Sequence, residues 1–376
     1  MNTKNEGSQG ASLPLKANGG LGLPFYICAS LLAAFVVFVL VNAESGAVSP
    51  STKNIVNAAS HNPPPPFLPG FDMVFWGQVI AVFLAVTIAV GFVWGWKRYP
   101  KHPLLLMMLA SNSVCWLDPF NNWSIYLVYN PRLWHFPQDW PWVGLSPIIQ
   151  PLMNFLYLPY VLTPYFIAIA ILRRMQRKRP MDAFVWQRPL VSLAILTFIA
   201  GFIFDALQEV FMVSTQFYTY SHIVTFGSAF VGKYNQFPLL MASSLITIMM
   251  IPAAVLLYRD DTGKTQAEKL AQRLKLFRNH PATATFLTMA IILNISFMLF
   301  ISAFYAVRVT GLATSVACPW PYPESVVYDP NGYYESEGQL GPFWEGRMNN
   351  WFAGLPDGRP ENIKTITDRC DTRNLK

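Results

Sequence analysis

The chain has 376 residues, of which 53% are hydrophobic and only 12% charged, whereas a soluble domain carries about a quarter charged residues. This composition excludes an ordinary soluble protein, and the long apolar runs are typical of a polytopic membrane protein. The net charge of +7 does not indicate a nucleic-acid partner, because the basic residues fall in short loops between apolar runs. We therefore expect no nucleic-acid binding.

Seven apolar segments are long enough to cross a bilayer, each with about 20 residues. The sequence therefore predicts an all-α, polytopic bundle of about seven transmembrane helices over residues 21–43, 73–96, 103–123, 146–172, 189–213, 235–258 and 283–307. The third span is the weakest, because it turns polar at Ser111-Asn112-Ser113. We expect it to end near Pro119 or to be interrupted there.

Lys and Arg in the connections indicate the orientation. They are concentrated before residue 21 and in 97–102, 173–188 and 259–282, whereas the alternate loops hold only Lys53, Arg132 and Lys233. The positive-inside rule then places the N-terminus inside and the C-terminal tail outside a cell membrane. We expect a cytoplasmic tail at 1–20, a transmembrane domain at 21–307 and an extracytoplasmic tail at 308–376.

Two features at the ends of the chain leave alternatives open. The first span ends in Val41-Asn42-Ala43, which resembles a signal-peptide cleavage site, but its apolar core is longer than a signal peptide requires. We favour a retained helix; cleavage would leave the other six spans oriented in the same way. In the outer tail, a Cys318–Cys370 disulfide would close a loop of about 50 residues, and the alternative is two unpaired thiols.

Three carboxylates lie inside the predicted spans, where ionisable groups are costly and usually functional. Asp118 lies near the outer end of the third span, and Asp205 and Glu209, four residues apart, share one face of the fifth. Such a pair can separate into an acid and a base, and we predict catalytic roles for all three. Alternatively, Asp205 and Glu209 are interfacial residues or structural hydrogen-bond partners of Asn154 and Tyr157.

Other polar residues fall at a similar depth and predict a polar cavity in the outer half of the membrane. The predicted substrate-binding residues are Trp116, Asn121, Asn122, Trp123, Asn154, Tyr157, Gln208 and Asn294. The outer loop that follows residue 123 is rich in Trp and Tyr. These rings either form the usual interfacial belt or cover a hydrophobic substrate and stabilise a cation through their faces.

The sequence lacks the motifs of cofactor-dependent classes, and we expect no cofactor and no metal. All five histidines lie outside the predicted spans, so no span offers a pair of haem ligands, and no His/Cys cluster has zinc spacing. Neither a phosphate-binding glycine loop nor a G-x-S-x-G serine motif is present. The function classes that remain are acid–base chemistry on an organic substrate, and binding or transport without covalent chemistry.

The stretch CWLDPFNNW at 115–123, followed by NPRLWHFP at 130–137, resembles the AveC-like spirocyclase family. This is a group of actinobacterial integral membrane proteins named after the spiroketal cyclase of avermectin biosynthesis. The resemblance covers residues from about 70 to 310. It implies acid-catalysed closure of a polyketide dihydroxy-ketone to a spiroketal, sometimes with dehydration.

We therefore expect a membrane-embedded spirocyclase or dehydratase that acts on a hydrophobic polyketide- or lipid-derived substrate. Asp118 would be the acid, Asp205 or Glu209 the base, and the tryptophans would stabilise an oxocarbenium ion. The alternative is a non-enzymatic transporter component or an accessory subunit of an envelope complex. The expected partners are the small-molecule or lipid substrate and membrane lipids; the sequence does not indicate the oligomeric state.

Overall fold

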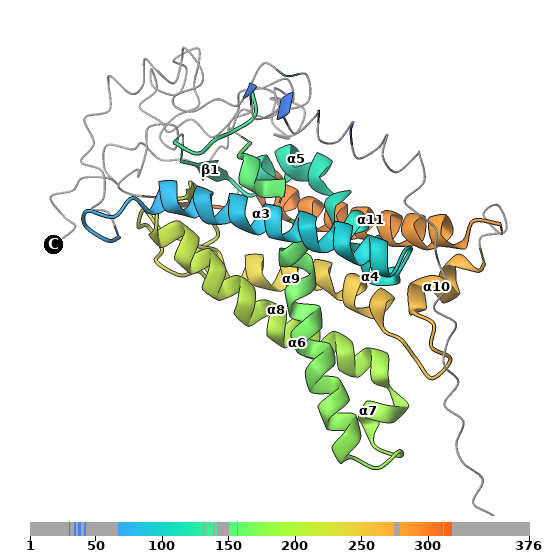
Figure 1. Ribbon diagram of the computed structural model, residues 1–376. Helices are drawn as coiled ribbons and strands as arrows, with labels where there is room; N and C mark the ends of the chain where they lie inside the picture. The colour runs from blue at the N-terminus through green and yellow to red at the C-terminus, as the bar shows by residue number, and fades with distance from the viewer. Residues whose placement is uncertain are drawn as a thin grey trace, which may run out of the picture. The chain divides into compact units, whose positions relative to one another are not determined.

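The structure is a computed structural model that describes residues 67–130, 132–137, 140, 150–155, 157–273, 279–310 and 312–317, with six isolated positions between residues 30 and 42. The chain divides into two compact units, Met1–Val41 and Asn42–Lys376. The labelled elements of Figure 1 all belong to the second unit. The expected tail at 1–20 and nearly all of the expected first span lie outside the described residues, as does most of the expected tail at 308–376.

The described part of the second unit is mainly helical, as the sequence predicts, with short strands that it does not predict. The helices are α3 (Met73–Arg98), α4 (Pro103–Asn112), α5 (Asp118–Ser124), α6 (Tyr157–Lys178), α7 (Phe184–Gln187), α8 (Pro189–Ser214), α9 (Leu239–Leu257), α10 (Gln266–Ala271) and α11 (Pro281–Val309). Two 3₁₀ turns are η1 (Cys115–Leu117) and η3 (Leu152–Phe155). The strands are β1 (Leu127–Tyr129), β2 (Tyr218–Tyr220), β3 (His222–Ile223) and β4 (Ser315–Val316).

Four helices of the described chain are long and apolar enough to cross a membrane, namely α3, α8, α9 and α11. The helices predicted at 73–96, 189–213, 235–258 and 283–307 are confirmed to within about one turn at each end. The helix predicted at 146–172 differs more, because α6 begins at Tyr157 and continues to Lys178. Pro151, just before it, pairs instead with His135 in a β-bridge.

The segment predicted as a third span, 103–123, is not one helix. α4 ends at Asn112, and η1 leads into α5, where Pro119 occupies the first turn. The break comes earlier than the expected one at Pro119, because the Ser113 hydroxyl bonds back to the carbonyl of Ala110 at 2.6 Å and competes with the helix. The 10 residues of α4 span only about 15 Å.

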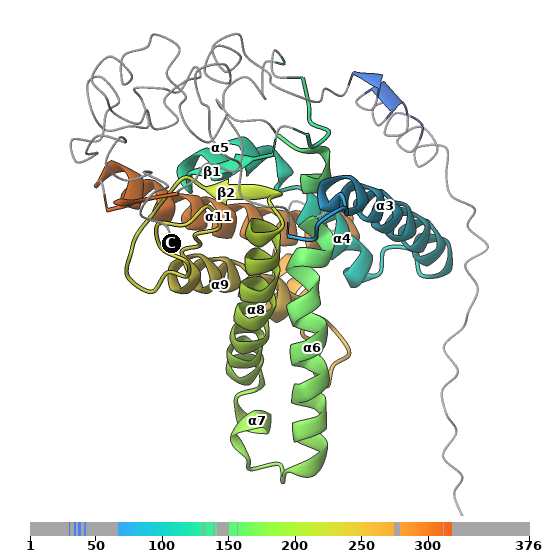
Figure 2. The same cartoon turned by 90° about the vertical axis from the view of Figure 1, so that its left-hand side faces the viewer.

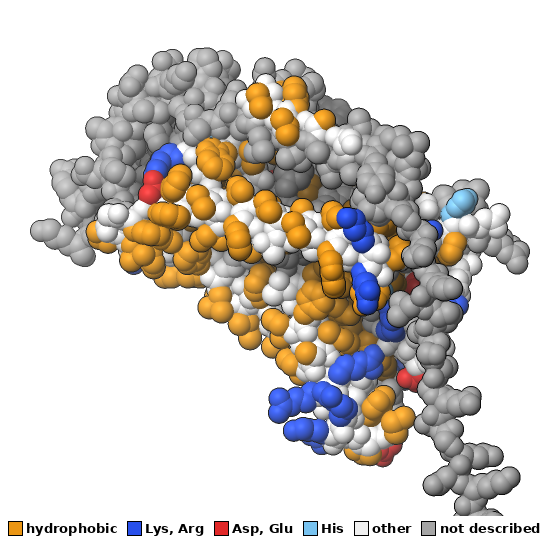
Figure 3. Space-filling view, viewed as in Figure 1, with side chains coloured by type: hydrophobic (Ala, Val, Ile, Leu, Met, Phe, Trp, Pro, Cys, Tyr) orange, Lys and Arg blue, Asp and Glu red, His pale blue; other side chains and the backbone are white. Residues whose placement is uncertain are grey.

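The helices pack into one bundle with an apolar outer surface. α8 packs against α6 and α9, and α11 packs against α4, α9 and α10. Figure 2 shows α6 and α8 as an antiparallel pair joined through α7. Exposed side chains along α3 and α8 are mainly apolar, whereas Figure 3 shows Lys and Arg gathered toward the α7 end. A protein surface that faces lipid and has one basic end shows this separation.

Two left-handed residues turn helices into strands. Tyr126, with φ 58°, follows α5, and Gln216, with φ 62°, follows α8. The chain thereby enters β1 and β2, which pair antiparallel with Tyr129 opposite Tyr218. These strands are too short for alternation to reveal them in the sequence. Their pairing links the chain that follows α5 to the chain that follows α8.

Gly201 lets α8 and α9 approach each other closely. A Cβ at Gly201 would lie 2.6 Å from Cγ2 of Thr247, whereas a Cβ at Gly91 of α3 would meet nothing within 4 Å. We expect Gly201→Ala to lower the free energy of unfolding by about 1–3 kcal/mol through overpacking. Thermal unfolding in detergent measures this, with Gly91→Ala as the matched control. Equal melting temperatures for the two variants would contradict the close packing.

Candidate functional site

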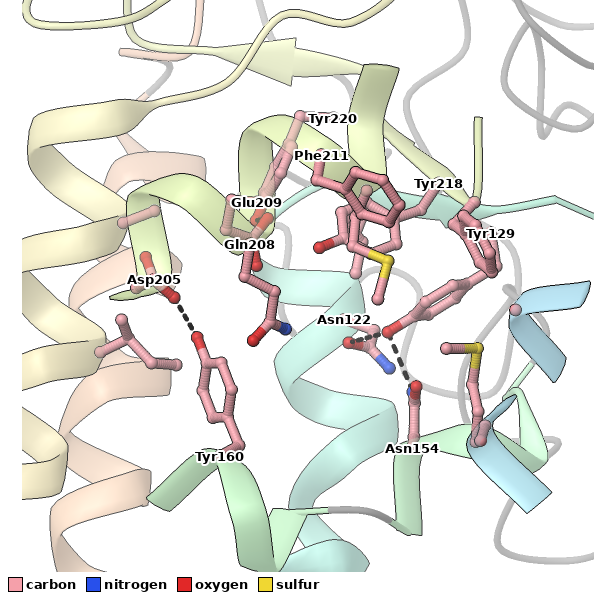
Figure 4. A pocket seen from close by; sticks show the side chains of 18 of the residues that line it. Asn122, Tyr129, Asn154, Tyr160, Asp205, Gln208, Glu209, Phe211, Tyr218 and Tyr220 are labelled. Carbon is pink, nitrogen blue, oxygen red and sulfur yellow. Dashed lines mark hydrogen bonds between the residues drawn. The ribbon is translucent and has the colours of Figure 1, made fainter. Parts of the chain in front are cut away.

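A cavity of about 490 Å³ lies between α3 and α8 and extends to residues of α5, β1, η3, α6, β2, α9 and α11. Most of its lining is Phe, Met, Leu, Ile and Ala. Ten lining residues have a side chain with a carboxyl, amide or phenol group: Asn121, Asn122, Tyr129, Asn154, Tyr160, Asp205, Gln208, Glu209, Tyr218 and Tyr220. Figure 4 shows two walls of polar groups, a carboxylate wall with Asp205 and Glu209 and an amide wall with Asn122, Tyr129 and Asn154.

The carboxylate wall is formed by Asp205 and Glu209, one helical turn apart on the cavity side of α8 (Figure 4). The Tyr160 hydroxyl on α6 donates to Oδ1 of Asp205, and the buried Ser243 hydroxyl on α9 lies beside the same carboxylate. Asp205 is 1% exposed and interacts electrostatically with Glu209. Two carboxyl groups are therefore close together in a largely apolar cavity.

Two tyrosines of β2 contact Glu209. The Tyr220 hydroxyl donates to Oε2 of Glu209 at 2.8 Å, and the Tyr218 hydroxyl is also hydrogen-bonded to this carboxylate. Burial raises the pKa of both phenols well above their usual range, and the charge of Glu209 raises it further. Both tyrosines therefore keep their protons and can donate.

The amide wall faces the carboxylates across the cavity and consists of Asn122, Tyr129 and Asn154 (Figure 4). The Tyr129 hydroxyl donates to Oδ1 of Asn122 at 3.2 Å and accepts from Nδ2 of Asn154 at 2.9 Å. Burial raises the pKa of Tyr129 well above its usual range. This wall is thus a chain of neutral hydrogen-bonding groups.

Asp118 lies behind the amide wall and is not among the residues that line the cavity. Its Oδ2 accepts from Nδ2 of Asn122 at 2.8 Å and from Nδ2 of Asn154 at 2.7 Å, and the residue is 6% exposed. Nδ2 of Asn122 also donates to Gln150 at 3.0 Å. Because a carboxylate can only accept, both amides must turn their NH₂ groups toward Asp118.

Some of the other predicted substrate-binding residues line the cavity, and others pack elsewhere in the helix bundle. Asn121 and Gln208 line the cavity. Trp116 and Asn294 lie together elsewhere, because Nε1 of Trp116 donates to Oδ1 of Asn294 at 2.6 Å. Nδ2 of Asn294 donates in turn to the Ser113 hydroxyl at 2.9 Å. This pair ties η1 to α11 beside the break after α4.

Trp123 belongs to a second buried cluster. Its ring lies 4.1 Å from Cζ of Arg308, whose guanidinium also lies 3.7 Å from the ring of Tyr126. Arg308 is 2% exposed and donates to the carbonyl of Trp123. The cluster joins the end of α11 to the turn between α5 and β1, next to the amide wall.

Some predictions fall outside the described residues, and some site residues were not predicted. The side chain of Tyr157 and both cysteines, Cys318 and Cys370, lie outside the described residues. The residues missed are Tyr160, Tyr218 and Tyr220, whereas Tyr129 belongs to the outer loop whose rings the sequence predicts as an interfacial belt or a substrate cover. The pattern Y-T-Y at 218–220 places two phenols on one face of a strand, which could have indicated them.

The comparison with protein families gives one match. The model of a family described as spirocyclase AveC-like matches residues 96–328, well over half of the chain. The matched region contains both walls of the cavity and begins in the last turn of α3. No curated protein and no solved structure matches the chain.

Proposed function

Because the chain belongs to the AveC-like spirocyclase family, we propose that it is a multi-pass membrane enzyme that closes a hydrophobic hydroxylated ketone to a spiroketal. The observation that carries this proposal is the pair of carboxyl groups, Asp205 and Glu209, in an apolar cavity, each hydrogen-bonded to a tyrosine. The facing amide wall supplies neutral groups that can hold hydroxyls of the substrate. The substrate is of polyketide or lipid origin.

The reaction requires one proton donor and one proton acceptor at the same carbon. The first hydroxyl adds to the ketone and forms a hemiketal. Protonation of the hemiketal hydroxyl lets it leave as water and produces an oxocarbenium ion; the second hydroxyl then attacks this carbon and gives up its proton. The product is the substrate minus one water, and no net proton is consumed.

The carboxylate pair fits both roles. Two carboxyl groups that interact in a water-poor cavity are most stable when they share one proton. The protonated member delivers the proton to the leaving hydroxyl, and the ionised member accepts one from the attacking hydroxyl. The remaining negative charge stabilises the oxocarbenium ion between the walls. We assign Asp118 to positioning, since it holds the amides of Asn122 and Asn154.

For the membrane arrangement we propose the predicted topology, with the N-terminus inside, the C-terminal tail outside and α4, η1 and α5 together forming an interrupted third span. Contacts between helix ends that we expect on the cytoplasmic side support this topology. A guanidinium nitrogen of Arg259, after α9, lies 3.3 Å from Nε2 of His102, before α4. Arg173, near the end of α6, donates to the carbonyl of Arg259 at 2.6 Å. The cavity then lies in the outer half of the membrane.

The test is a mass profile of lipid and polyketide extracts from a deletion strain. We expect a species to accumulate that exceeds the missing one by the mass of one water, and the wild-type gene to reverse this. Purified protein in vesicles should convert the accumulated species to the missing one. A profile without any pair of species that differs by water would contradict the cyclase and favour a transporter component or accessory subunit.

Tyr160 offers a smaller test of the carboxylate wall. We expect Tyr160→Phe to lower the conversion rate by roughly 10- to 100-fold, because a hydrogen bond to a charged group contributes about 1.5–3 kcal/mol. The rate is measured as product per protein in vesicles. Tyr165→Phe on the same helix is the matched control, since Tyr165 does not line the cavity. Equal rates for the two variants would remove Tyr160 from the mechanism.

A further inference from the structure

One face of α3 lines the cavity along about three turns. Its lining residues recur at helical spacing and are Met73, Trp76, Gly77, Ile80, Ala81 and Leu84. Phe204, Gln208 and Phe211 of α8 line the same cavity. Apart from Gln208 these side chains are apolar, and we call the space between the two helices the α3–α8 slot.

α3 approaches the bundle closely at two glycines, near its two ends. A Cβ at Gly77 would lie 2.1 Å from Cζ of Phe217, and a Cβ at Gly95 would lie 3.1 Å from Cδ2 of Leu105. The second of these contacts is with α4, and α3 also packs against η3. Ile80 and Leu84 lie between the two glycines, so the slot is held open there.

The edges of the slot are apolar and lie on the surface. Ile80 is 58% exposed and Leu84 43% on α3, and Phe211 is 46% exposed on α8. Because α3 and α8 are both long and apolar enough to cross a membrane, these edges would face acyl chains rather than water. The slot is therefore the side of the cavity that a molecule dissolved in the bilayer can reach.

The end of the cavity beside the C-terminus of α8 is covered by protein. β1 and β2 form this wall, and all of their residues are buried. Tyr129 of β1 and Tyr218 of β2 meet there at 5.5 Å between ring centroids. A substrate arriving from water at this end would have to separate the two strands, whereas the slot requires no backbone hydrogen bond to break.

We propose that the hydrocarbon part of the substrate enters through the α3–α8 slot from the bilayer and remains there, while its oxygenated end reaches Glu209 and Asn122. The proposal rests on the proposed function, because it assigns a substrate class to the same cavity. That class is bilayer-dissolved molecules with hydroxyl groups at one end of a hydrocarbon chain, not short water-soluble polyols. The match to the family begins at residue 96, so the slot face of α3 lies outside the matched region.

Photolabelling of the full chain in phosphatidylcholine vesicles tests this route. The probe is a long-chain fatty alcohol that carries a diazirine in its alkyl chain, and adducts are located by peptide mass spectrometry. We expect adducts at Ile80, Leu84 and Phe204, and loss of most of them in Ala81→Trp, where an indole fills the slot. Val86→Trp is the matched control, because Val86 lies on α3 but does not line the cavity.

Adducts at Ile80, Leu84 and Phe204 that persist in Ala81→Trp would overturn the proposal, as would adducts confined to outward-facing residues such as Val86. An Ala81→Trp protein that fails to fold is replaced by Ala81→Leu, for which partial loss is expected. The same labelling in Glu209→Gln separates the two proposals, because this variant is expected to lose turnover while its slot is still labelled. A labelled slot without turnover in the wild type refutes the cyclase but not the route; turnover with an unlabelled slot refutes the route alone.

Discussion

Replacing Glu209 by glutamine is expected to slow conversion by about 10²- to 10⁴-fold, the usual contribution of a positioned general acid or base. Glutamine has nearly the same size as glutamate. It can still accept a hydrogen bond from the Tyr220 hydroxyl, which lies 2.8 Å from Oε2 of Glu209 in the wild type. The fold should therefore persist, but the side chain can no longer exchange a proton with Asp205. The rate of water-loss product per unit of protein, at equal membrane levels, measures the effect.

Asp118→Asn is the matched control for this prediction, because it makes the same chemical change behind the amide wall. Its Oδ1 can still accept from Asn122 and Asn154, so we expect less than about a tenfold loss of rate and about 1 kcal/mol of stability. Two outcomes would contradict these roles. A complete loss in Asp118→Asn would assign the acid to Asp118, and full activity in Glu209→Gln would exclude Glu209 from proton transfer.

Arg308→Ala is expected to lower the free energy of unfolding by about 3 kcal/mol. It removes a charge-assisted hydrogen bond to the Trp123 carbonyl, contacts with two aromatic faces and the volume between them. The turn after α5 loses its support, so conversion should fall as well. Thermal unfolding in detergent, together with the rate in vesicles, measures both effects.

Arg308→Lys separates charge from shape in this cluster. An ammonium keeps the charge but cannot lie flat between the rings of Trp123 and Tyr126. We expect it to recover about half of the lost stability. If Arg308→Ala unfolded at the wild-type temperature, the cluster would have no structural role.

The long helices follow from the sequence because their ends are marked locally. Pro189 and Pro281 open α8 and α11 where the sequence predicts spans to begin, and each occupies the first turn. The spacing of Asp205 and Glu209 likewise predicts a shared face, and both line the cavity. These features depend on neighbours within one or two helical turns, which sequence patterns report well.

The composition of the amide wall depends on contacts that are distant in the chain. Asn154 meets Asp118 across 36 residues, and Tyr129 meets Tyr218 only because β1 and β2 pair. Trp116 lies within the predicted third span, and its indole bonds to Asn294, 178 residues away. Local periodicity carries no information about such partners, so the polar residues could be predicted while their partners could not.

Asn122 and Asn154 both direct their NH₂ groups to one oxygen of Asp118. Oδ1 of Asn122 already accepts from the Tyr129 hydroxyl, whereas Oδ1 of Asn154 is turned away from Asp118 and can accept from a substrate hydroxyl. A carbonyl oxygen binds an alcohol but not the corresponding methyl ether or ester, and leaving it unpaired costs about 1–3 kcal/mol, roughly a tenfold to hundredfold loss in kcat/KM. A substrate whose hydroxyl is already capped would therefore be rejected despite its similar size. Methylation or esterification of that oxygen would have to follow ring closure, so the orientation of the Asn154 amide would determine the order in which such a molecule is modified.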